Sequence, residues 1–143
     1  MKLSEKRIYE MIEKAEEAWA RAYAPYSGFQ VGASVLGGSG RVYGGCNVEN
    51  SSFGLTLCAE RSALASAVAA GETEIKAVVV FTDTAEPTVP CAACRGVLAE
   101  FNSQMIVVMA AKNGIQKRMN LSELLPDPFV LHSEDRKKNK QIK

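Results

Sequence analysis

The chain has 143 residues, of which 47% are hydrophobic, and a formal net charge of +1 at pH 7. This length suits one compact domain and is short for two. The near-neutral charge argues against a protein that binds nucleic acid by neutralising phosphates, since such proteins carry basic patches and a high isoelectric point. There is no apolar run of 18 residues, and the chain starts with charged residues rather than a leader. We therefore expect no membrane span and no export.

The first half of the chain predicts a helix followed by a β-hairpin. Apolar residues recur every three or four positions across residues 4–24, the helical period, and Pro25 ends the pattern. Two strands are expected at 29–36 and 41–47, joined by a glycine-rich turn at 37–40. The same glycines could form a phosphate-binding loop, but no helix with a lysine follows them, so a turn is the better interpretation.

The second half alternates helices and strands. An alanine-rich helix is expected at 59–70, and Gly71 follows it as a C-terminal stop. The β-branched run at 75–82 predicts a strand that is covered on both faces. The remaining elements are a helix at 90–101, strands at 105–111 and 115–119, and a short helix at 120–125. This order predicts an α/β sandwich with a mixed sheet.

We expect residues 1–131 to form a single domain and residues 132–143 to form a charged, flexible tail. Lysine and arginine are abundant in this tail, which could alternatively act as an electrostatic tether. His132 is the only histidine, and its position beside the tail predicts an exposed side chain rather than a ligand or a base.

Three of the four cysteines have the spacing of metal ligands. Cys58 precedes Glu60 by two positions, and Cys91 and Cys94 form a C-x-x-C pair. Structural zinc sites usually have four protein ligands, whereas catalytic sites have three and leave the fourth position to water. We therefore predict a catalytic zinc that activates water near neutral pH, with Glu60 as the general acid and base. Because thiolates must stay reduced to bind zinc, we also expect a cytoplasmic protein.

Other interpretations of these cysteines remain open. Cys46 could be the last ligand of a four-cysteine structural site, or equally a small buried hydrophobic residue with a free thiol. A C-x-x-C pair taken alone is also typical of redox proteins. Zinc could finally stabilise the fold of a binding module that performs no catalysis.

Together the motifs resemble those of zinc-dependent deaminases. Cys58-Ala59-Glu60 and Pro90-Cys91-x-x-Cys94 are similar to the three-cysteine form of the family signature, and most similar to the small cytidine deaminases of pyrimidine salvage. The resemblance extends from about residue 23 to about residue 129. It implies a three-layer α/β/α sandwich with a five-stranded sheet, one zinc ion (Zn²⁺) per chain and a homotetramer. The implied reaction is hydrolysis of cytidine and deoxycytidine to uridine and deoxyuridine plus ammonia.

The resemblance also implies which residues contact the nucleoside. Asn47 and Glu49 lie two positions apart in a strand, so they project on the same side, and the family holds the ribose with such a pair. Phe29 resembles the aromatic residue that stacks on the base, although a phenylalanine that opens a strand is more often part of a core. The backbone of Ala59 is implied to meet the base.

Two arginines follow the metal ligands closely. Three thiolates around a divalent zinc leave one excess negative charge, which should weaken the effect of the metal on water. Arg61 and Arg95 could donate hydrogen bonds to the ligand sulfurs and offset this charge, a role that the family implies most clearly for Arg61. The alternative for both is an exposed arginine on a helix.

Two positions depart from the family pattern. Ala92 stands between the paired cysteines where glycine is usual, so its methyl group could narrow the pocket. Phe53 stands where tyrosine is common, which puts the hydrogen bond of that hydroxyl in doubt. The family implies that residues near Phe53 and Phe129 reach the site of a neighbouring subunit. A different substrate, such as a nucleoside antibiotic or an RNA, is the alternative; the near-neutral charge and the Asn47 and Glu49 pair favour a free nucleoside.

Overall fold

The computed structural model describes residues 2–131, and the predicted tail, with His132, lies outside the described residues. The helices are α1 (Glu5–Trp19), α2 (Ala59–Ala69), α3 (Ala92–Phe101) and α4 (Leu121–Leu124), with 3-10 turns η1 (Phe53–Leu55) and η2 (Lys112–Gly114). The strands are β1 (Gly32–Gly37), β2 (Val42–Cys46), β3 (Ile75–Phe81), β4 (Ile106–Ala110) and β5 (Gln116–Asn120). Within residues 2–131, no helix combines the length and the apolar character needed to cross a membrane.

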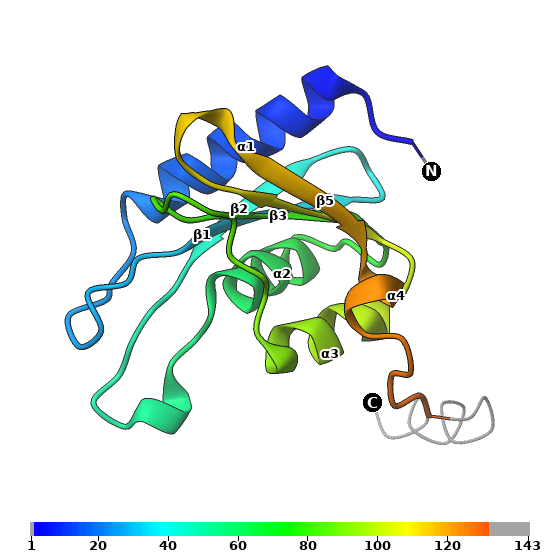
Figure 1. The fold of residues 1–143 in the computed structure, drawn as a ribbon. Coiled ribbons are helices and arrows are strands. Elements are labelled where there is room, and N and C mark those ends of the chain that lie inside the picture. The colour runs from blue at the N-terminus through cyan, green and yellow to red at the C-terminus, as the bar shows by residue number, and fades with distance from the viewer. Residues whose placement is uncertain (1, 132–143) are drawn as a thin grey trace.

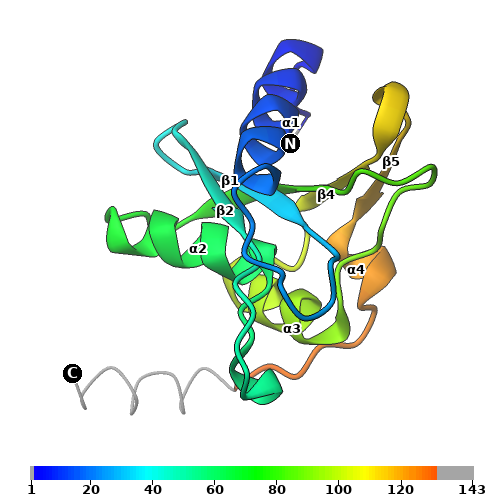
Figure 2. The same ribbon diagram turned by 90° about the vertical axis from the view of Figure 1, so that its left-hand side faces the viewer.

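The five strands form one mixed sheet in the order β2-β1-β3-β4-β5. Strand β1 is antiparallel to β2 and β3, β3 is parallel to β4, and β4 is antiparallel to β5. Helix α1 covers one face of the sheet, and α2 and α3 cover the other (Figures 1 and 2). The prediction of an α/β fold with a five-stranded mixed sheet is therefore confirmed.

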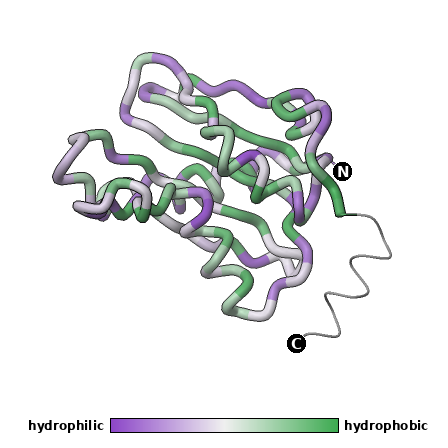
Figure 3. Tube along the Cα trace, turned by 90° about the horizontal axis from the view of Figure 1, so that it is seen from below, coloured by the Kyte–Doolittle hydropathy of each residue, from purple (hydrophilic) through white to green (hydrophobic). Residues whose placement is uncertain are grey.

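Each face of the sheet buries its own hydrophobic core. On the α1 side, Ile8, Met11 and Ala15 pack with alternate residues of β3 and β4. On the other side, alanines of α2 pack with Leu98 of α3 and with the opposite faces of the same strands. Strand β3 is buried along nearly its whole length, as its β-branched sequence predicts. The hydrophobic stretches that run through the middle of the molecule in Figure 3 include these strands.

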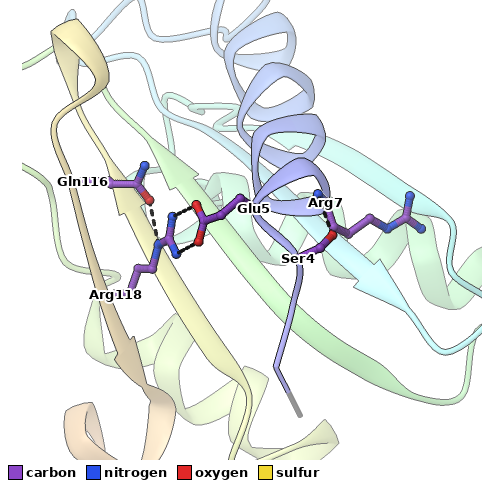
Figure 4. A network of polar contacts seen from close by, with 5 residues as sticks. All are labelled: Ser4, Glu5, Arg7, Gln116 and Arg118. Atoms are coloured by element: carbon purple, nitrogen blue, oxygen red, sulfur yellow. Dashed lines mark hydrogen bonds and ion pairs between the residues drawn. The ribbon is translucent and has the colours of Figure 1, made fainter.

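The first turn of α1 is joined by side chains to β5, an outer strand of the sheet. The Ser4 hydroxyl accepts a hydrogen bond from the Arg7 amide at 3.2 Å and caps the helix. Glu5 in the first turn accepts two hydrogen bonds from the Arg118 guanidinium of β5, at 2.7 and 2.8 Å (Figure 4). Gln116 accepts a third hydrogen bond from Arg118. Side chains therefore join α1 to β5, at the edge of the sheet.

Most elements match the expected ranges to within about two residues at each end, but two differ by more, and both differences lie beside the candidate site. Helix α1 ends at Trp19 instead of continuing to residue 24, since Tyr23 leaves the helix to form a β-bridge with Val48. Strand β1 begins at Gly32 instead of Phe29. Before Gly32, the Val31 carbonyl still accepts a hydrogen bond from the Asn47 backbone amide at 3.2 Å. The Val31 amide and the Phe29 carbonyl are bound by the Asn47 side chain, as described below.

Gly45 determines how closely α2 approaches β2. A Cβ atom at this position would lie 2.2 Å from the backbone nitrogen of Ala63 and 2.8 Å from the carbonyl oxygen of Ala59. Both contacts are with backbone, which can yield only if the helix moves. Gly45 thus sets the position of the N-terminal half of α2.

Replacing Gly45 with alanine is expected to lower the free energy of unfolding by about 1 to 3 kcal/mol, the usual cost of overpacking. Urea denaturation measures this change. Gly96→Ala is the matched control, because no atom lies within 4 Å of its missing Cβ and alanine favours the surrounding helix α3. Equal stability of the Gly45→Ala and wild-type proteins would contradict the close packing of α2 on β2.

Candidate active site

The three cysteine sulfurs form one cluster. Cys58, Cys91 and Cys94 place their sulfur atoms within 4.8 Å of one another. The Cys58 and Cys91 sulfurs are 3.8 Å apart. Two ligands of a tetrahedral zinc with bonds of about 2.3 Å would be about 3.8 Å apart. Both the donor atoms and their spacing fit a zinc ion.

Two helix starts bring these cysteines together. Cys58 is the N-cap of α2, and Cys91 is the N-cap of α3, whose first turn holds Cys94. Burial alone would raise the pKa of the Cys91 thiol, but hydrogen bonds from Cys94 and Cys58 bring this pKa below its usual value. Burial, followed by the charge of Glu60, raises the pKa of Cys94 far above its usual range. A bound cation would therefore be needed to hold all three as thiolates.

Cys46 lies away from the cluster. On β2, the missing Cβ of Gly44 faces Lys14 of α1, whereas that of Gly45 faces α2. Because side chains alternate along a strand, Cys46 points to the α1 side. It lines a surface hollow with Lys14 and Arg21. The alternative in which Cys46 is the fourth ligand of a structural zinc site is therefore wrong, because Cys46 does not reach the other three sulfurs.

Glu60 lies in the first turn of α2, beside the cluster. Its side chain is 4% exposed, and its Oε2 atom accepts a hydrogen bond from the Cys94 sulfur at 3.5 Å. Burial raises the pKa of this carboxyl group, and hydrogen bonds and the nearby Arg61 oppose the rise. Glu60 and Glu49 are the two carboxylates among the described residues that line the adjoining cavity. Glu60 is the one that is buried next to the ligand atoms.

A cavity of about 260 Å³ opens beside Glu60 and the cluster. Seven predicted site residues line it: Phe29, Asn47, Glu49, Cys58, Ala59, Glu60 and Cys91. Six lining residues were not predicted: Ser27, Val31, Thr56, Val80, Thr88 and Val89. Two of the three predicted metal ligands, the acid/base group and the nucleoside contacts therefore meet around one hollow, although they come from separate parts of the sequence.

Known proteins share this sequence pattern and this fold. Residues 5–110 match the family model described as the cytidine and deoxycytidylate deaminase zinc-binding region. The chain belongs to this deaminase family. A cytidine deaminase of Sporosarcina psychrophila is 42% identical over 123 residues, which cover 85% of this chain and 90% of the relative. A second, from Halalkalibacterium halodurans, is 44% identical over 121 residues, which cover 84% and 92%.

The fold of the deaminase is also found in solved structures. The crystal structure of a cytidine deaminase from Burkholderia pseudomallei superposes with a TM-score of 0.82 at 42% identity, covering 89% of this chain and all of the other. The matched family region includes Cys58, Glu60, Cys91 and Cys94. The predicted resemblance and the predicted zinc cofactor are therefore confirmed at the level of the family.

The predicted nucleoside contacts of the deaminase hold one loop in place. The Asn47 side chain is buried, accepts a hydrogen bond from the Val31 amide at 2.8 Å and donates one to the Phe29 carbonyl at 2.9 Å. Glu49 accepts hydrogen bonds from the backbone amides of Tyr26 and Ser27, each at 3.0 Å. Phe29 itself is 44% exposed, so it is no part of the core and its ring is free to meet a ligand.

Arg61 of the deaminase lies where it can support the cluster. Its Nη2 atom donates to the Cys58 sulfur at 3.3 Å and lies 3.4 Å from the Thr56 carbonyl oxygen. The hydrogen bonds to Cys58 and Cys94 raise the pKa of Arg61 further above its already high value, so the guanidinium stays charged. This geometry supports the predicted role of Arg61 beside a ligand sulfur.

Replacing Arg61 with alanine is expected to lower kcat by roughly tenfold while about one zinc ion per chain stays bound, because the thiolate charge would no longer be offset. Steady-state kinetics and metal analysis on the same preparation measure both quantities. Arg41→Ala is the control, because Arg41 is an exposed arginine at the turn between β1 and β2 and does not line the cavity. Unchanged kcat in the Arg61→Ala protein would contradict this role.

Arg95 differs from the sequence expectation. Its Nη1 atom donates to the Leu124 carbonyl oxygen at 2.7 Å, and this bond joins α3 to α4. No hydrogen bond from Arg95 to a sulfur is found among the described residues. Four positions after Cys91, the side chain points along α3 toward α4 rather than back to the cluster.

The departures from the family pattern lie outside the cavity. Ala92 is exposed and does not line the cavity, so its methyl group does not narrow it. Phe53 is 72% exposed and begins η1, the 3-10 turn in the segment that projects between β2 and α2 (Figures 1 and 2). Its ring packs edge to face on Tyr26, with centroids 5.7 Å apart. Phe129 is 86% exposed. The roles of both phenylalanines toward a neighbouring subunit remain predictions.

Proposed function

We propose that this chain catalyses the zinc-dependent hydrolytic deamination of cytidine and deoxycytidine, which yields uridine and deoxyuridine plus ammonia. One observation carries this proposal: a single cavity is lined by Glu60, by two cysteines of the cluster, and by Phe29, Asn47 and Glu49. A structural zinc site needs neither a buried carboxylate beside the sulfurs nor a cavity next to it.

The chemistry divides between the metal and Glu60. Zinc held by Cys58, Cys91 and Cys94 would supply a Lewis acid that lets water lose its proton near neutral pH. Glu60 accepts that proton as the water oxygen bonds to C4 of the pyrimidine and delivers it to N3. It then takes the remaining proton of the new C4 hydroxyl and delivers it to the amino nitrogen, as the C4 carbonyl forms. The C4–N bond breaks and ammonia leaves. Arg61 donates to the Cys58 sulfur throughout and offsets the thiolate charge.

The remaining residues bind and orient the nucleoside. Phe29 is assigned to stacking on the base, and the backbone of Ala59 to meeting its polar edge. Asn47 and Glu49 are assigned to the sugar hydroxyls. Both already bind the loop that carries Phe29, so each would bind the sugar with lone pairs and protons that remain free.

Assembly as a homotetramer is part of the proposal. Tyr26, Phe53, Leu55 and Phe129 are exposed. The rings of Tyr26 and Phe53 pack on each other, and exposed apolar clusters of this kind are typical of contact surfaces. A second hollow, lined by Tyr26 and Phe53, adjoins the cavity through Ser27, Glu49 and Thr56. Sedimentation equilibrium should give four chains per particle, and a monomer would contradict the assembly. A cytoplasmic role in pyrimidine salvage suits thiolates that must stay reduced.

The test of the proposed function is the ultraviolet absorbance of cytidine and of deoxycytidine mixed with the zinc-loaded protein. We expect the cytidine absorbance to fall and ammonia to appear in equal amount. Protein with about one zinc per chain that converts neither nucleoside would contradict the proposal and favour another substrate or a zinc-stabilised binding module.

A further inference from the structure

Ser27 connects the two predicted halves of the nucleoside site. Its hydroxyl donates a hydrogen bond to Oε2 of Glu49 and accepts one from the Phe29 amide at 3.0 Å. Its backbone amide donates to Oε1 of the same carboxylate at 3.0 Å. Ser27 therefore contacts both oxygens of Glu49 and the backbone of the aromatic residue that faces the cavity.

The surrounding loop leaves Glu49 dependent on these bonds. The Glu49 carboxylate has no ion pair among the described residues. Within the same part of the chain, it accepts hydrogen bonds from the amides of Tyr26 and Ser27 and from the Ser27 hydroxyl. These bonds hold the pKa of Glu49 below its usual value, the hydroxyl of Ser27 most strongly, so the group stays ionised. Without the Ser27 hydroxyl, Oε2 of Glu49 would lose this hydrogen bond, and the carboxylate would be free to rotate.

We propose that Ser27 is a positioning residue that couples the orientation of Glu49 toward the sugar to the placement of Phe29 against the base. This inference rests on the proposed function. Ser27 lines the cavity but lies on a different loop from the cysteine cluster, so it should act on nucleoside binding rather than on the bond-breaking step.

The chain contains a matched control for this arrangement. At the turn between β1 and β2, the amide and the hydroxyl of Ser39 both donate to the carboxylate of Glu72, and the Arg41 amide donates to the Ser39 hydroxyl. The serine, the carboxylate and the amide two positions later thus repeat the Ser27 pattern. Neither Ser39 nor Glu72 lines the cavity. Ser39→Ala therefore removes the same kind of bonds away from the site.

The experiment compares Ser27→Ala, Ser27→Thr and Ser39→Ala. For Ser27→Ala we expect KM for cytidine to rise by about tenfold or more, the effect of losing a hydrogen bond to a charged group, with kcat changed by less than about threefold. Ser27→Thr keeps the hydroxyl on an exposed position and should restore KM to within about threefold of wild type. Ser39→Ala should leave KM unchanged.

Calorimetric binding of uridine, which carries the same sugar and is not converted, gives a second measurement. Its Kd should rise in Ser27→Ala by about the same factor as KM and return to the wild-type value in Ser27→Thr. Wild-type KM and uridine affinity in Ser27→Ala, or an equal loss in Ser39→Ala, would overturn the inference. Wild-type protein that is inactive on cytidine would instead overturn the proposed function, and the uridine affinities would still test Ser27.

Discussion

Replacing Glu60 with glutamine is expected to lower kcat for cytidine by roughly 10²- to 10⁴-fold, the usual contribution of a general acid and base. Glutamine keeps the shape of the side chain, but it cannot take a proton from water and pass it to the base. Zinc content and the thermal unfolding midpoint should stay close to those of the wild type. Initial rates at saturating cytidine, with metal analysis, measure the effect.

Glu49→Gln is the matched control, because it removes a carboxylate from the same cavity without touching the cysteine cluster. We expect it to raise KM and to lower kcat far less than Glu60→Gln does, since binding and proton transfer are separate tasks. If Glu60→Gln kept wild-type kcat, proton transfer would have to be assigned to another group and the proposed mechanism would be wrong.

Replacing Cys91 with serine is expected to remove both zinc and activity. Serine is a good N-cap, so it can still accept the hydrogen bond that the Cys94 amide now gives to the Cys91 sulfur, and α3 should keep its first turn. Its neutral hydroxyl is a poor zinc ligand compared with a thiolate. Zinc should fall from about one per chain to a small fraction of that, and turnover should fall to background. Metal analysis after dialysis, beside an activity assay, measures both.

Cys46→Ala provides the control, since Cys46 lies on the α1 side of β2 and the three other cysteines form the cluster. This protein should keep its full zinc content and its activity. A loss of zinc in Cys46→Ala, or full zinc with full activity in Cys91→Ser, would contradict the assignment of Cys58, Cys91 and Cys94 as the ligand set.

Regular periodicity made most of the fold predictable. The β-branched run gave β3, and the alanine-rich run gave α2 to within a residue at its end. The predicted end of α1 is too late because the Tyr23 backbone pairs with the segment around Val48, which is distant in sequence. The predicted start of β1 is too early because side chains bind the backbone there. Gln30 donates to the Trp19 carbonyl, and Asn47 binds both sides of residue 30, which a local pattern cannot reveal.

The candidate site divides in the same way. The spacing of Cys58, Cys91 and Cys94 is a strong signal because a metal constrains its ligands tightly, and the structure places their sulfurs together. Ser27 was not predicted as a site residue, although a serine two positions before an aromatic residue can bind that residue's amide. Arg95 follows a ligand even more closely than Arg61 does, yet it bonds to Leu124. The sequence pattern could not reveal this bond, since the position of α4 depends on packing across the whole chain.

The arrangement of β5 affects how copies of this chain can associate. It is an outer strand, and an unprotected outer strand offers its backbone to other chains as a template for aggregation. Lys117 and Arg118 are adjacent on β5, so they project on opposite faces. The charge of Arg118 is paired with Glu5, whereas the exposed Lys117 places a positive charge on the other face of the edge. A second β5 laid against the first would bring like charges together. Growth into a cross-β fibre through this edge is thereby disfavoured.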